Sequence, residues 1–347
     1  MTKKLAKGGS AMRRLAVCLT MLLLLTGCGG GNETDWSALS PAQADRLVIY
    51  TSHPESVYAP IAKEFEERTG IWVQVETGGT GELLERLEAE KDAPRCDLLF
   101  GGGADSLSAQ KELFAPYVSP LTDEVASEFL CGDGSWTPFS SVPLVLIYNP
   151  VLVRSNPPEG WESLLDPVWR GRIAFADPRV SGLAYTALST MLQILPADGV
   201  LEAFHRNLGG QTLPGAGTAA DEVADAVAEG SCTVGVTEEA AALEAVRTGR
   251  DVALLYPKEG TSAAADGIAV INGCTHEENA RKFIDFALSA DVQQHLARTC
   301  RRRPVRTELL PLTDGTDGLV CIDYDLDRAA GSREDILSAW QSLEDRS

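Results

Sequence analysis

Basic residues are scarce in this chain relative to acidic ones. Thirty lysines and arginines stand against 50 aspartates and glutamates, which gives a formal net charge of −20. Nucleic-acid binding relies on a surplus of lysine and arginine that neutralises phosphates. The composition therefore argues against nucleic acid as a partner. An anionic small molecule would have to be held by local amides, hydroxyls or a few basic side chains against the overall charge.

Residues that hold metals or carry out nucleophilic catalysis are also few. The four histidines are scattered and none belongs to a His-Glu-x-x-His motif, and the eight cysteines include no Cys-x-x-Cys pair. Zinc sites typically use such spacings. No serine stands in a Gly-x-Ser-x-Gly turn, and no serine, histidine and aspartate follow a recognisable order. We therefore expect no enzyme activity, no cofactor and no metal site.

The chain also lacks an apolar run long enough to cross a bilayer as a stable helix. Its best candidate, Leu15–Leu25, is short, follows five basic residues and ends at Leu25-Thr26-Gly27-Cys28, a bacterial lipobox. We expect 1–27 to be a lipoprotein signal peptide whose removal changes the net charge from −20 to −25. Cys28 would then carry lipid, and 28–45 would be a flexible tether to the extracytoplasmic face of the membrane, in the cell envelope.

Six cysteines remain when Cys18 and Cys28 are set aside. An even number in an exported chain favours disulfide bonds, and six cysteines allow fifteen pairings. Closeness in sequence favours one bridge between Cys96 and Cys131 and another among Cys274, Cys300 and Cys321. Cys232 is left without a preferred partner.

From Leu47 onward, short apolar runs alternate with stretches of helical spacing, which is typical of α/β proteins. We expect strands at 47–51, 71–76, 97–100, 144–148, 173–176, 233–236, 252–256 and 267–271. We expect helices at 57–69, 82–91, 185–195, 199–208, 219–229, 240–248, 279–288, 292–299 and 333–343. Loops at the carboxyl ends of such strands collect ligands. From three of these loops we take as candidate ligand-binding residues Ser52, His53, Gly79, Thr80 and Gly102.

The stretch Gly171–Leu188 has the pattern of an anion-binding site. A short apolar run is stopped by Asp177-Pro178, and Ser181-Gly182 then opens a run of helix formers. The first amides of a helix have no partner inside it and carry partial positive charge. Ser181 can add a hydroxyl, and Gly182 lets a ligand approach the backbone. An ordinary capped helix would show the same pattern.

Several blocks of sequence point to one family. The middle of the chain carries Trp161–Pro167, Trp169–Ala174 and Asp177–Tyr185, its start carries 47–52 and 65–70, and its end carries 267–286 and 302–306. Together these blocks resemble bacterial extracellular solute-binding proteins of the ferric-iron, phosphonate and hexose-phosphate branch. The likeness covers nearly all of 47–343, and the motifs are specific as a set although each alone is weak.

The resemblance implies an α/β, two-lobed type II periplasmic-binding-protein fold. Each lobe would be a mixed sheet flanked by helices, and hinge strands would join the lobes around a cleft that closes on ligand. Lobe 1 would comprise 46–143 and 257–347, which includes the closing helices, and lobe 2 would comprise 144–256. The resemblance also implies an ABC permease and its ATPase as partners, and we expect the chain to be a monomer.

Ferric-binding members of the family use two adjacent tyrosines just after the strand that matches Thr233–Val236. This chain has Thr237-Glu238-Glu239 there, and no two of its tyrosines are adjacent, which argues against a ferric ligand. Both glutamates could instead accept hydrogen bonds from sugar hydroxyls or an amine, although they could equally form a solvated helix start. We add to the candidate ligand-binding residues Thr237, Glu238 and Asp266.

Two further features have competing explanations. His53 could contact a phosphate or a hydroxyl, but a lone histidine is more often a surface residue. The cluster Arg301–Arg306 could attract anions, but beside so many carboxylates it more often forms structural ion pairs.

The sequence thus predicts a membrane-anchored lipoprotein that captures a small phosphorylated or phosphonate anion, of hexose-phosphate or aminophosphonate type, for an ABC importer. Amides and hydroxyls near Ser181-Gly182 and Gly79-Thr80 would hold the anion, and Ser52, His53 and Glu238 would contact the rest of the ligand. Two alternatives stay open: a ferric or other metal ligand, and a ligand-sensing lipoprotein that feeds a sensor kinase.

Overall fold

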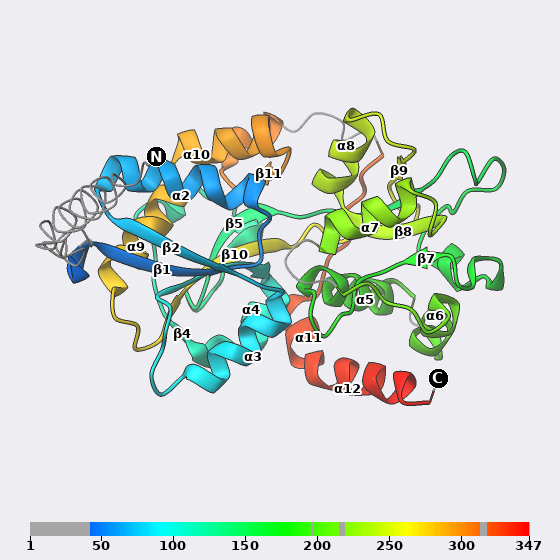
Figure 1. The fold of residues 1–347 in the computed structure, drawn as a ribbon, viewed down its shortest axis with the longest axis horizontal. Helices are drawn as coiled ribbons and strands as arrows, with labels where there is room; N and C mark the ends of the chain where they lie inside the picture. Colours follow the sequence, from blue (N-terminus) through cyan, green and yellow to red (C-terminus); the bar gives the residue numbers. More distant parts are fainter. Residues whose placement is uncertain (1–41, 196–197, 215–218, 313–317, 347) are drawn as a thin grey trace, which may run out of the picture. The chain divides into compact units, whose positions relative to one another are not determined.

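The computed structural model describes residues 42–195, 198–214, 219–312 and 318–346 (Figure 1). The predicted signal peptide, Cys28 and most of the predicted tether lie outside these ranges. Within them, no helix is long and apolar enough to cross a membrane. Residues Gln43–Ser347 form one compact unit, which contains two separate sheets.

The first sheet has seven strands in the order β11-β5-β10-β3-β1-β2, with β4 also paired to β10. Strand β1 is parallel to β2 and β3, whereas β10 is antiparallel to β3, β4 and β5. The strands are β1 (Arg46–Thr51), β2 (Trp72–Thr77), β3 (Leu98–Gly103), β4 (Phe114–Ala115), β5 (Thr137–Ser141), β10 (Ala265–Ile271) and β11 (Arg303–Pro304).

Helices cover both faces of this sheet because β1 buries side chains on both sides. Leu47 and Ile49 pack with Phe65 and Phe283 on one face, while Tyr50 packs with the leucines of α3 on the other. Figure 1 shows α2, α9 and α10 on the first face and α3 and α4 on the second. The bounds are α2 (Glu55–Thr69), α3 (Thr80–Glu90), α4 (Ala104–Ala109), α9 (Glu277–Ala287) and α10 (Ala290–His295). We call this sheet and its helices the first lobe.

The second sheet has four strands in the order β7-β8-β6-β9, with β8 antiparallel to β6 and parallel to β7. Its helices α5 and α6 lie on one face and α7 and α8 on the other (Figure 1). We call these elements the second lobe. Their bounds are β6 (Leu144–Tyr148), β7 (Ile173–Ala174), β8 (Val234–Glu238), β9 (Ala253–Leu255), α5 (Gly182–Ile194), α6 (Val200–Leu208), α7 (Ala219–Ala228) and α8 (Glu239–Arg247).

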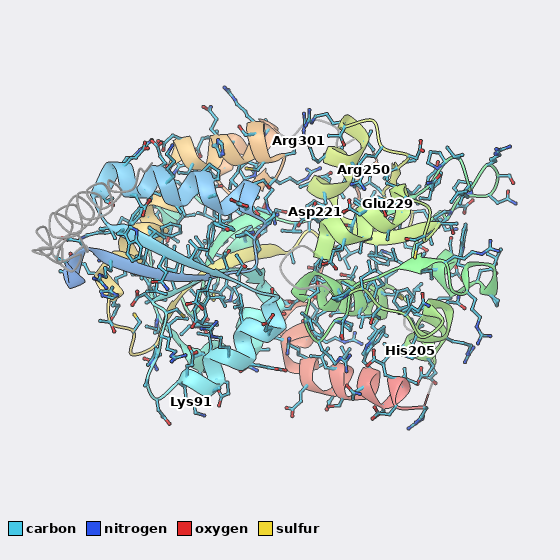
Figure 2. The ribbon with its side chains drawn as sticks, viewed as in Figure 1. Lys91, His205, Asp221, Glu229, Arg250 and Arg301 are labelled. Carbon is cyan, nitrogen blue, oxygen red and sulfur yellow. The ribbon has the colours of Figure 1, made fainter. Side chains whose placement is uncertain are left out.

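The stretch that leaves the first lobe after β5 and the stretch that returns to it before β10 hydrogen-bond to each other. The Val142 N–H donates to the Ala264 carbonyl at 3.0 Å, and the Leu144 N–H donates to the Ser262 carbonyl at 3.2 Å. The chain ends with α11 (Leu326–Gly331) and α12 (Arg333–Glu344). Trp340 of α12 is fully buried in the core of the second lobe, and His205 of α6 packs edge-on against it at 5.0 Å (Figure 2).

The two-lobed α/β architecture predicted from the sequence is confirmed. The lobe boundaries at 143–144 and 256–257 stay a prediction, because the described chain from Gln43 onward is one compact unit. Several short elements were not predicted: α4, β4, β5, β11 and α11.

The predicted disulfide bonds are absent from the described residues, where all six cysteines are free thiols. Cys96 is buried in the first lobe's core, while the Cys131 thiol donates to the Asp133 carboxylate at 3.1 Å. The Cys300 thiol lies against the Ser56 carbonyl, and the backbone at Cys321 forms a short parallel β-bridge with Thr261.

Candidate functional site

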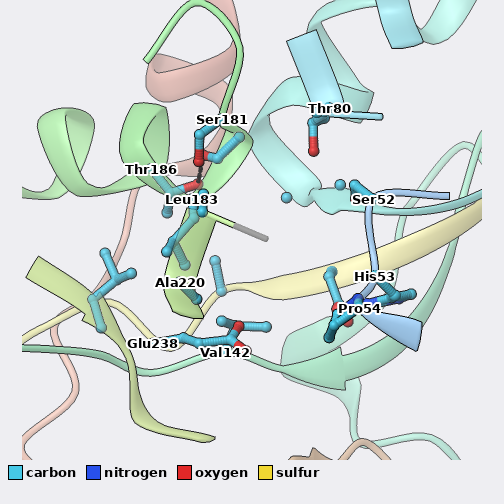
Figure 3. A pocket seen from close by; sticks show the side chains of 18 of the residues that line it. Ser52, His53, Pro54, Thr80, Val142, Ser181, Leu183, Thr186, Ala220 and Glu238 are labelled. Carbon is cyan, nitrogen blue, oxygen red and sulfur yellow. Dashed lines mark hydrogen bonds and ion pairs between the residues drawn. The ribbon is translucent and has the colours of Figure 1, made fainter. Parts of the chain in front are cut away.

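A cavity of about 110 Å³ lies where the two lobes meet. This volume is several times the roughly 10–15 Å³ that one water molecule needs, so the cavity has room for a small molecule. Figure 3 shows Ser52, His53 and Thr80 of the first lobe on one side and Ser181, Leu183 and Thr186 of α5 on the other. The lining residues are Ser52, His53, Pro54, Gly79, Thr80, Gly102, Gly103, Val142, Leu144, Ser181, Gly182, Leu183, Thr186, Ala219, Ala220, Asp221, Glu238, Ala264, Ala265, Asp266 and Arg302.

Two helix N-termini meet at this cavity. Helix α3 begins at Thr80 and helix α5 begins at Gly182. Among the described residues, the backbone N–H groups of Thr80, Gly182 and Leu183 have no hydrogen-bond partner, as expected for first-turn amides. The Ser181 hydroxyl accepts a hydrogen bond from the Ala184 N–H at 3.2 Å, so it caps α5 while its own proton stays available to a ligand. This end of the cavity presents unpaired donors and partial positive charge.

Glycines allow the two helix starts to approach each other. The Gly81 N–H donates to the Val180 carbonyl across the lobes at 2.8 Å. A Cβ on Gly81 would lie 2.8 Å from the Arg179 carbonyl carbon and closer still to its oxygen, and a Cβ on Gly182 would lie 2.9 Å from the Thr80 hydroxyl. Side chains at either glycine would keep the lobes apart.

The other end of the cavity carries carboxylates bridged by one arginine. The guanidinium of Arg302 donates to Glu238 and to Asp266, each at 2.9 Å, and to the Ser140 hydroxyl at 3.1 Å. A β-bulge at Asp266–Gly267 shifts the register of β10 against β5, and such bulges redirect side chains. Ser140 completes the hydrogen bonding of Asp266 by donating from its N–H and hydroxyl at 2.8 and 2.7 Å.

Burial and ion pairing act in opposite directions on these groups. Burial raises the pKa of Glu238, and Arg302 partly offsets that rise. Burial alone would lower the pKa of Arg302, but Glu238 and Asp266 outweigh it and raise the pKa above its usual value. The pair Arg302–Glu238 also crosses between the lobes, because Arg302 precedes β11 in the first lobe and Glu238 ends β8 in the second.

His53 is a buried residue of the cavity wall and not a surface residue. Its ring packs edge-on against Phe100 at 4.6 Å, and its Nε2 lies 3.7 Å from the Asp266 carboxylate without a hydrogen-bond partner among the described residues. Burial lowers the pKa of His53 from 6.5 to about 4, with Asp266 opposing the shift and Arg302 adding to it. The imidazole is therefore neutral at neutral pH and retains hydrogen-bonding capacity.

Nine of the ten predicted ligand-binding residues line the cavity; the exception is Thr237. Thr237 is fully buried, and its hydroxyl donates to the Ala220 carbonyl at 3.0 Å. Successive side chains of a strand point to opposite faces, so Glu238 faces the cavity and Thr237 faces away. Glu239 is also turned away from the cavity, because its carboxylate pairs with Arg303 at 2.6 Å.

Four further residues with polar side chains or close backbone contact line the cavity and were not predicted from the sequence: Arg302, Thr186, Asp221 and Gly103. Structural pairing of the arginine cluster was expected and is observed for Arg303 with Glu239 and for Arg306 with Glu124 and Glu308. The sequence of this arginine cluster could not show that Arg302, unlike its neighbours, forms its ion pairs inside the cavity. Within the described ranges, no group of three or more histidine, cysteine, aspartate or glutamate residues is arranged to hold a metal ion.

Comparison with known proteins decides the family. Residues 93–315 match the family model for bacterial extracellular solute-binding proteins. The chain belongs to this family. The resemblance seen in the sequence is thereby confirmed, as is the type II fold of this solute-binding protein.

Three relatives of this solute-binding protein differ in what their names say they bind. It is 28% identical to the periplasmic binding protein AfuA from Actinobacillus pleuropneumoniae, solved with exogenous fructose-6-phosphate bound, over 87% of this chain and 99% of that one, with a TM-score of 0.78. It is 25% identical to a putative 2-aminoethylphosphonate-binding periplasmic protein of Salmonella typhimurium, over 80% of this chain and 85% of the relative. It is 26% identical to iron uptake protein A1 of Synechocystis sp., over 81% of each chain.

Proposed function

We propose that this solute-binding protein captures a small phosphate- or phosphonate-bearing molecule in the cavity between its lobes. The observation that carries the proposal is the meeting of two helix N-termini, whose amides at Thr80, Gly182 and Leu183 have no partner in the described structure. Such amides suit the oxygens of a phosphate or phosphonate group. The hydroxyls of Ser52, Thr80 and Ser181 add further donors at the same end.

The rest of the ligand would lie toward Glu238, Asp221 and His53. Carboxylates accept hydrogen bonds from sugar hydroxyls or an amine, which a hexose phosphate or an aminophosphonate respectively presents. The relative solved with fructose-6-phosphate bound and the relative named for 2-aminoethylphosphonate support both ligand types. Inorganic phosphate alone would leave this carboxylate end without donors to bind.

The protein would deliver its ligand to an ABC permease and the ATPase of that permease. A ligand that binds the closed conformation more tightly than the open one shifts the lobes toward closure, and the permease would recognise the closed form. Lipid on Cys28 would hold the monomeric protein at the extracytoplasmic membrane surface. If the protein instead signals to a sensor kinase, it would bind its ligand in the same way and contact the kinase in place of the permease.

A ferric ligand is the second candidate, because iron uptake protein A1 is a relative of similar identity. Against it, none of the described residues that line the cavity is a tyrosine, and two of the three carboxylates among those residues, Glu238 and Asp266, already pair with Arg302. Iron would have to displace Arg302 to use them.

Isothermal titration calorimetry separates these candidates. The protein without its first 28 residues would be titrated with fructose 6-phosphate, 2-aminoethylphosphonate, inorganic phosphate and ferric citrate. We expect saturable binding of at least one organic phosphate or phosphonate. Tight ferric binding with no response to the organic compounds would refute the proposal and establish the alternative.

Ser181→Asp tests where the anion sits. Aspartate is a good N-cap, so α5 should still form, but its charge would repel the anion at the start of the helix. Ser289→Asp is the matched control, since Ser289 precedes α10 away from the cavity. We expect only Ser181→Asp to abolish binding. Undiminished affinity in that variant would show that the anion binds elsewhere.

A further inference from the structure

Beside the cavity lies a fully buried carboxylate that the proposed function does not use. Asp105 stands in the first turn of α4 and is 0% exposed, and it is absent from the cavity wall. One carboxylate oxygen accepts from the Ser106 N–H at 2.6 Å. The other accepts from the Thr186 hydroxyl at 2.8 Å and from the Tyr324 hydroxyl at 2.7 Å. Asp105 therefore gathers donors from three separate segments.

The donors Thr186 and Tyr324 come from the second lobe and from the C-terminal segment of the chain. Thr186 is part of α5, whose N-terminus lines the cavity. Tyr324 precedes α11, and the C-terminal segment that carries it is attached to the second lobe: the Tyr185 hydroxyl donates to the Ala329 carbonyl, and Trp340 is buried in that lobe's core. The Thr186 hydrogen bond thus runs from the second lobe to the first, and the Tyr324 hydrogen bond joins the first lobe to a segment that packs against both, because Leu326 of α11 lies against the first lobe's core.

No ion pair neutralises Asp105 among the described residues. Arg333 is near enough for Asp105 to influence its pKa, but its guanidinium lies over the ring of Tyr185, 5.2 Å from the centroid. Burial raises the pKa of Asp105, and its hydrogen bonds from Tyr324, Thr186 and Ser106 oppose the rise. A buried carboxylate held by hydrogen bonds depends strongly on each donor.

We propose that Asp105 is a positioning residue for ligand capture, whose hydrogen bonds to Thr186 and Tyr324 latch the second lobe and the C-terminal segment onto the first lobe. The latch raises the population of the closed conformation before a ligand binds. Because Thr186 lies one turn from Gly182, the latch also fixes the start of α5 against α4 of the first lobe. The inference rests on the lobe closure in the proposed function and not on the identity of the ligand.

The latch predicts a measurable shift in the lobe equilibrium. A protein whose binding-competent state is only partly populated shows an apparent affinity reduced by that fraction. Removal of one hydrogen bond to a charged acceptor lowers an equilibrium constant by about tenfold or more. Loss of the Tyr324 hydroxyl should therefore lower the ratio of closed to open protein by about tenfold, without any direct contact with the ligand.

The test measures the distance between the lobes with no ligand present. Spin-labelled, genetically encoded side chains would replace Lys91 of the first lobe and Glu229 of the second, both of them exposed (Figure 2). Thiol-reactive labels are not suitable because they would also react with the native cysteines. Tyr324→Phe would be compared with Tyr117→Phe, which removes a tyrosine hydroxyl donor to Asp285 within the first lobe. Pulsed electron paramagnetic resonance then gives the distance distributions.

We expect Tyr324→Phe to shift the distribution toward longer distances and Tyr117→Phe to match the wild type. If Tyr324→Phe does not fold, Thr186→Val removes the donor from the second lobe and makes the same prediction. Identical distributions in the folded latch variant and the wild type would overturn the proposal. Because this experiment uses no ligand, it tests the latch even if none of the phosphates or phosphonates binds in calorimetry.

Discussion

Gly81→Ala should abolish ligand capture while leaving the protein folded. Gly81 is the second residue of α3, where alanine fits the helical backbone and raises helix propensity by about 1 kcal/mol. The added Cβ would meet the carbonyl group of Arg179 in the second lobe, with the Arg179 carbon at 2.8 Å and the Val180 Cα at 3.3 Å. These are backbone atoms that cannot rotate away. The methyl group therefore opposes closure of the lobes and not the folding of either lobe.

The size of the effect follows from the distances. Carbon atoms in contact normally stand about 3.5–4.0 Å apart, so the lobes would have to separate by more than a few tenths of an ångström. Overpacking of this kind costs about 1–3 kcal/mol or more, and separation would also break the hydrogen bond from the Gly81 N–H to the Val180 carbonyl. Together these losses predict a fall in affinity of about 100-fold or more.

Calorimetry and thermal unfolding would be combined to check this prediction. Gly132→Ala is the matched control, because a Cβ there meets nothing within 4 Å and its φ is not positive. We expect the melting temperature of ligand-free Gly81→Ala to equal or exceed that of the wild type, while the ligand-induced stabilisation disappears. Wild-type affinity in Gly81→Ala would refute the reasoning, since the lobes would then not close as described.

Three further predictions concern residues of the cavity wall and its neighbours. Arg302→Met leaves Glu238 and Asp266 as unpaired buried charges, so we expect urea denaturation to show a loss of about 3–5 kcal/mol, and a loss below about 1 kcal/mol would contradict the buried ion pairs. Thr237→Val removes only the hydrogen bond to the Ala220 carbonyl, so stability should fall by about 1 kcal/mol with affinity unchanged; a large loss of affinity would return Thr237 to the binding site. The pKa of His53 is lowered from 6.5 to about 4 in the folded protein, so its neutral form stabilises the fold above pH 6.5, and about 3 kcal/mol should be lost as the pH falls toward 4. Denaturation of His53→Gln across this pH range should lack that part of the stability loss. Equal profiles of stability against pH for the wild type and His53→Gln would show that His53 does not cause it.

The sequence was informative wherever a periodic pattern coincided with a helix or strand signal. Strand β1, helix α2 and the start of α5 were predicted from apolar spacing and from Ser181-Gly182, and the structure places them within about three residues of the expected bounds. Strand β5 was missed because Thr137–Ser141 contains Pro138 and lacks alternation, although all five of its residues are buried. Its burial comes from β10 and β11 on either side, which only tertiary structure supplies.

The candidate site could be predicted only in part, for geometric reasons. The loops around Thr80 and Gly182 follow strand ends, so their convergence could be expected from topology. Thr237 and Glu238 are neighbours in β8, so their side chains face opposite sides of the sheet. A one-residue error in the predicted alternation exchanges the two, and the sequence alone does not exclude that error. The role of Arg302 depends on Glu238 and Asp266, which are 64 and 36 residues away in the chain. Asp105 ends one of the three loops expected to collect ligands, but its own role was not predicted because its donors Thr186 and Tyr324 come from distant segments.

In the proposed complex, the ligand's anionic group binds the amides at the starts of α3 and α5. Nuclear magnetic resonance of the deuterated, nitrogen-labelled protein tests it most directly, during titration with whichever organic phosphate or phosphonate binds in calorimetry. We expect large downfield shifts of the backbone amide protons of Thr80, Gly182 and Leu183, because each gains a hydrogen bond to a charged oxygen. Saturation of the protein with those three amides unshifted, and with changes confined to the carboxylate end around Glu238, would contradict it.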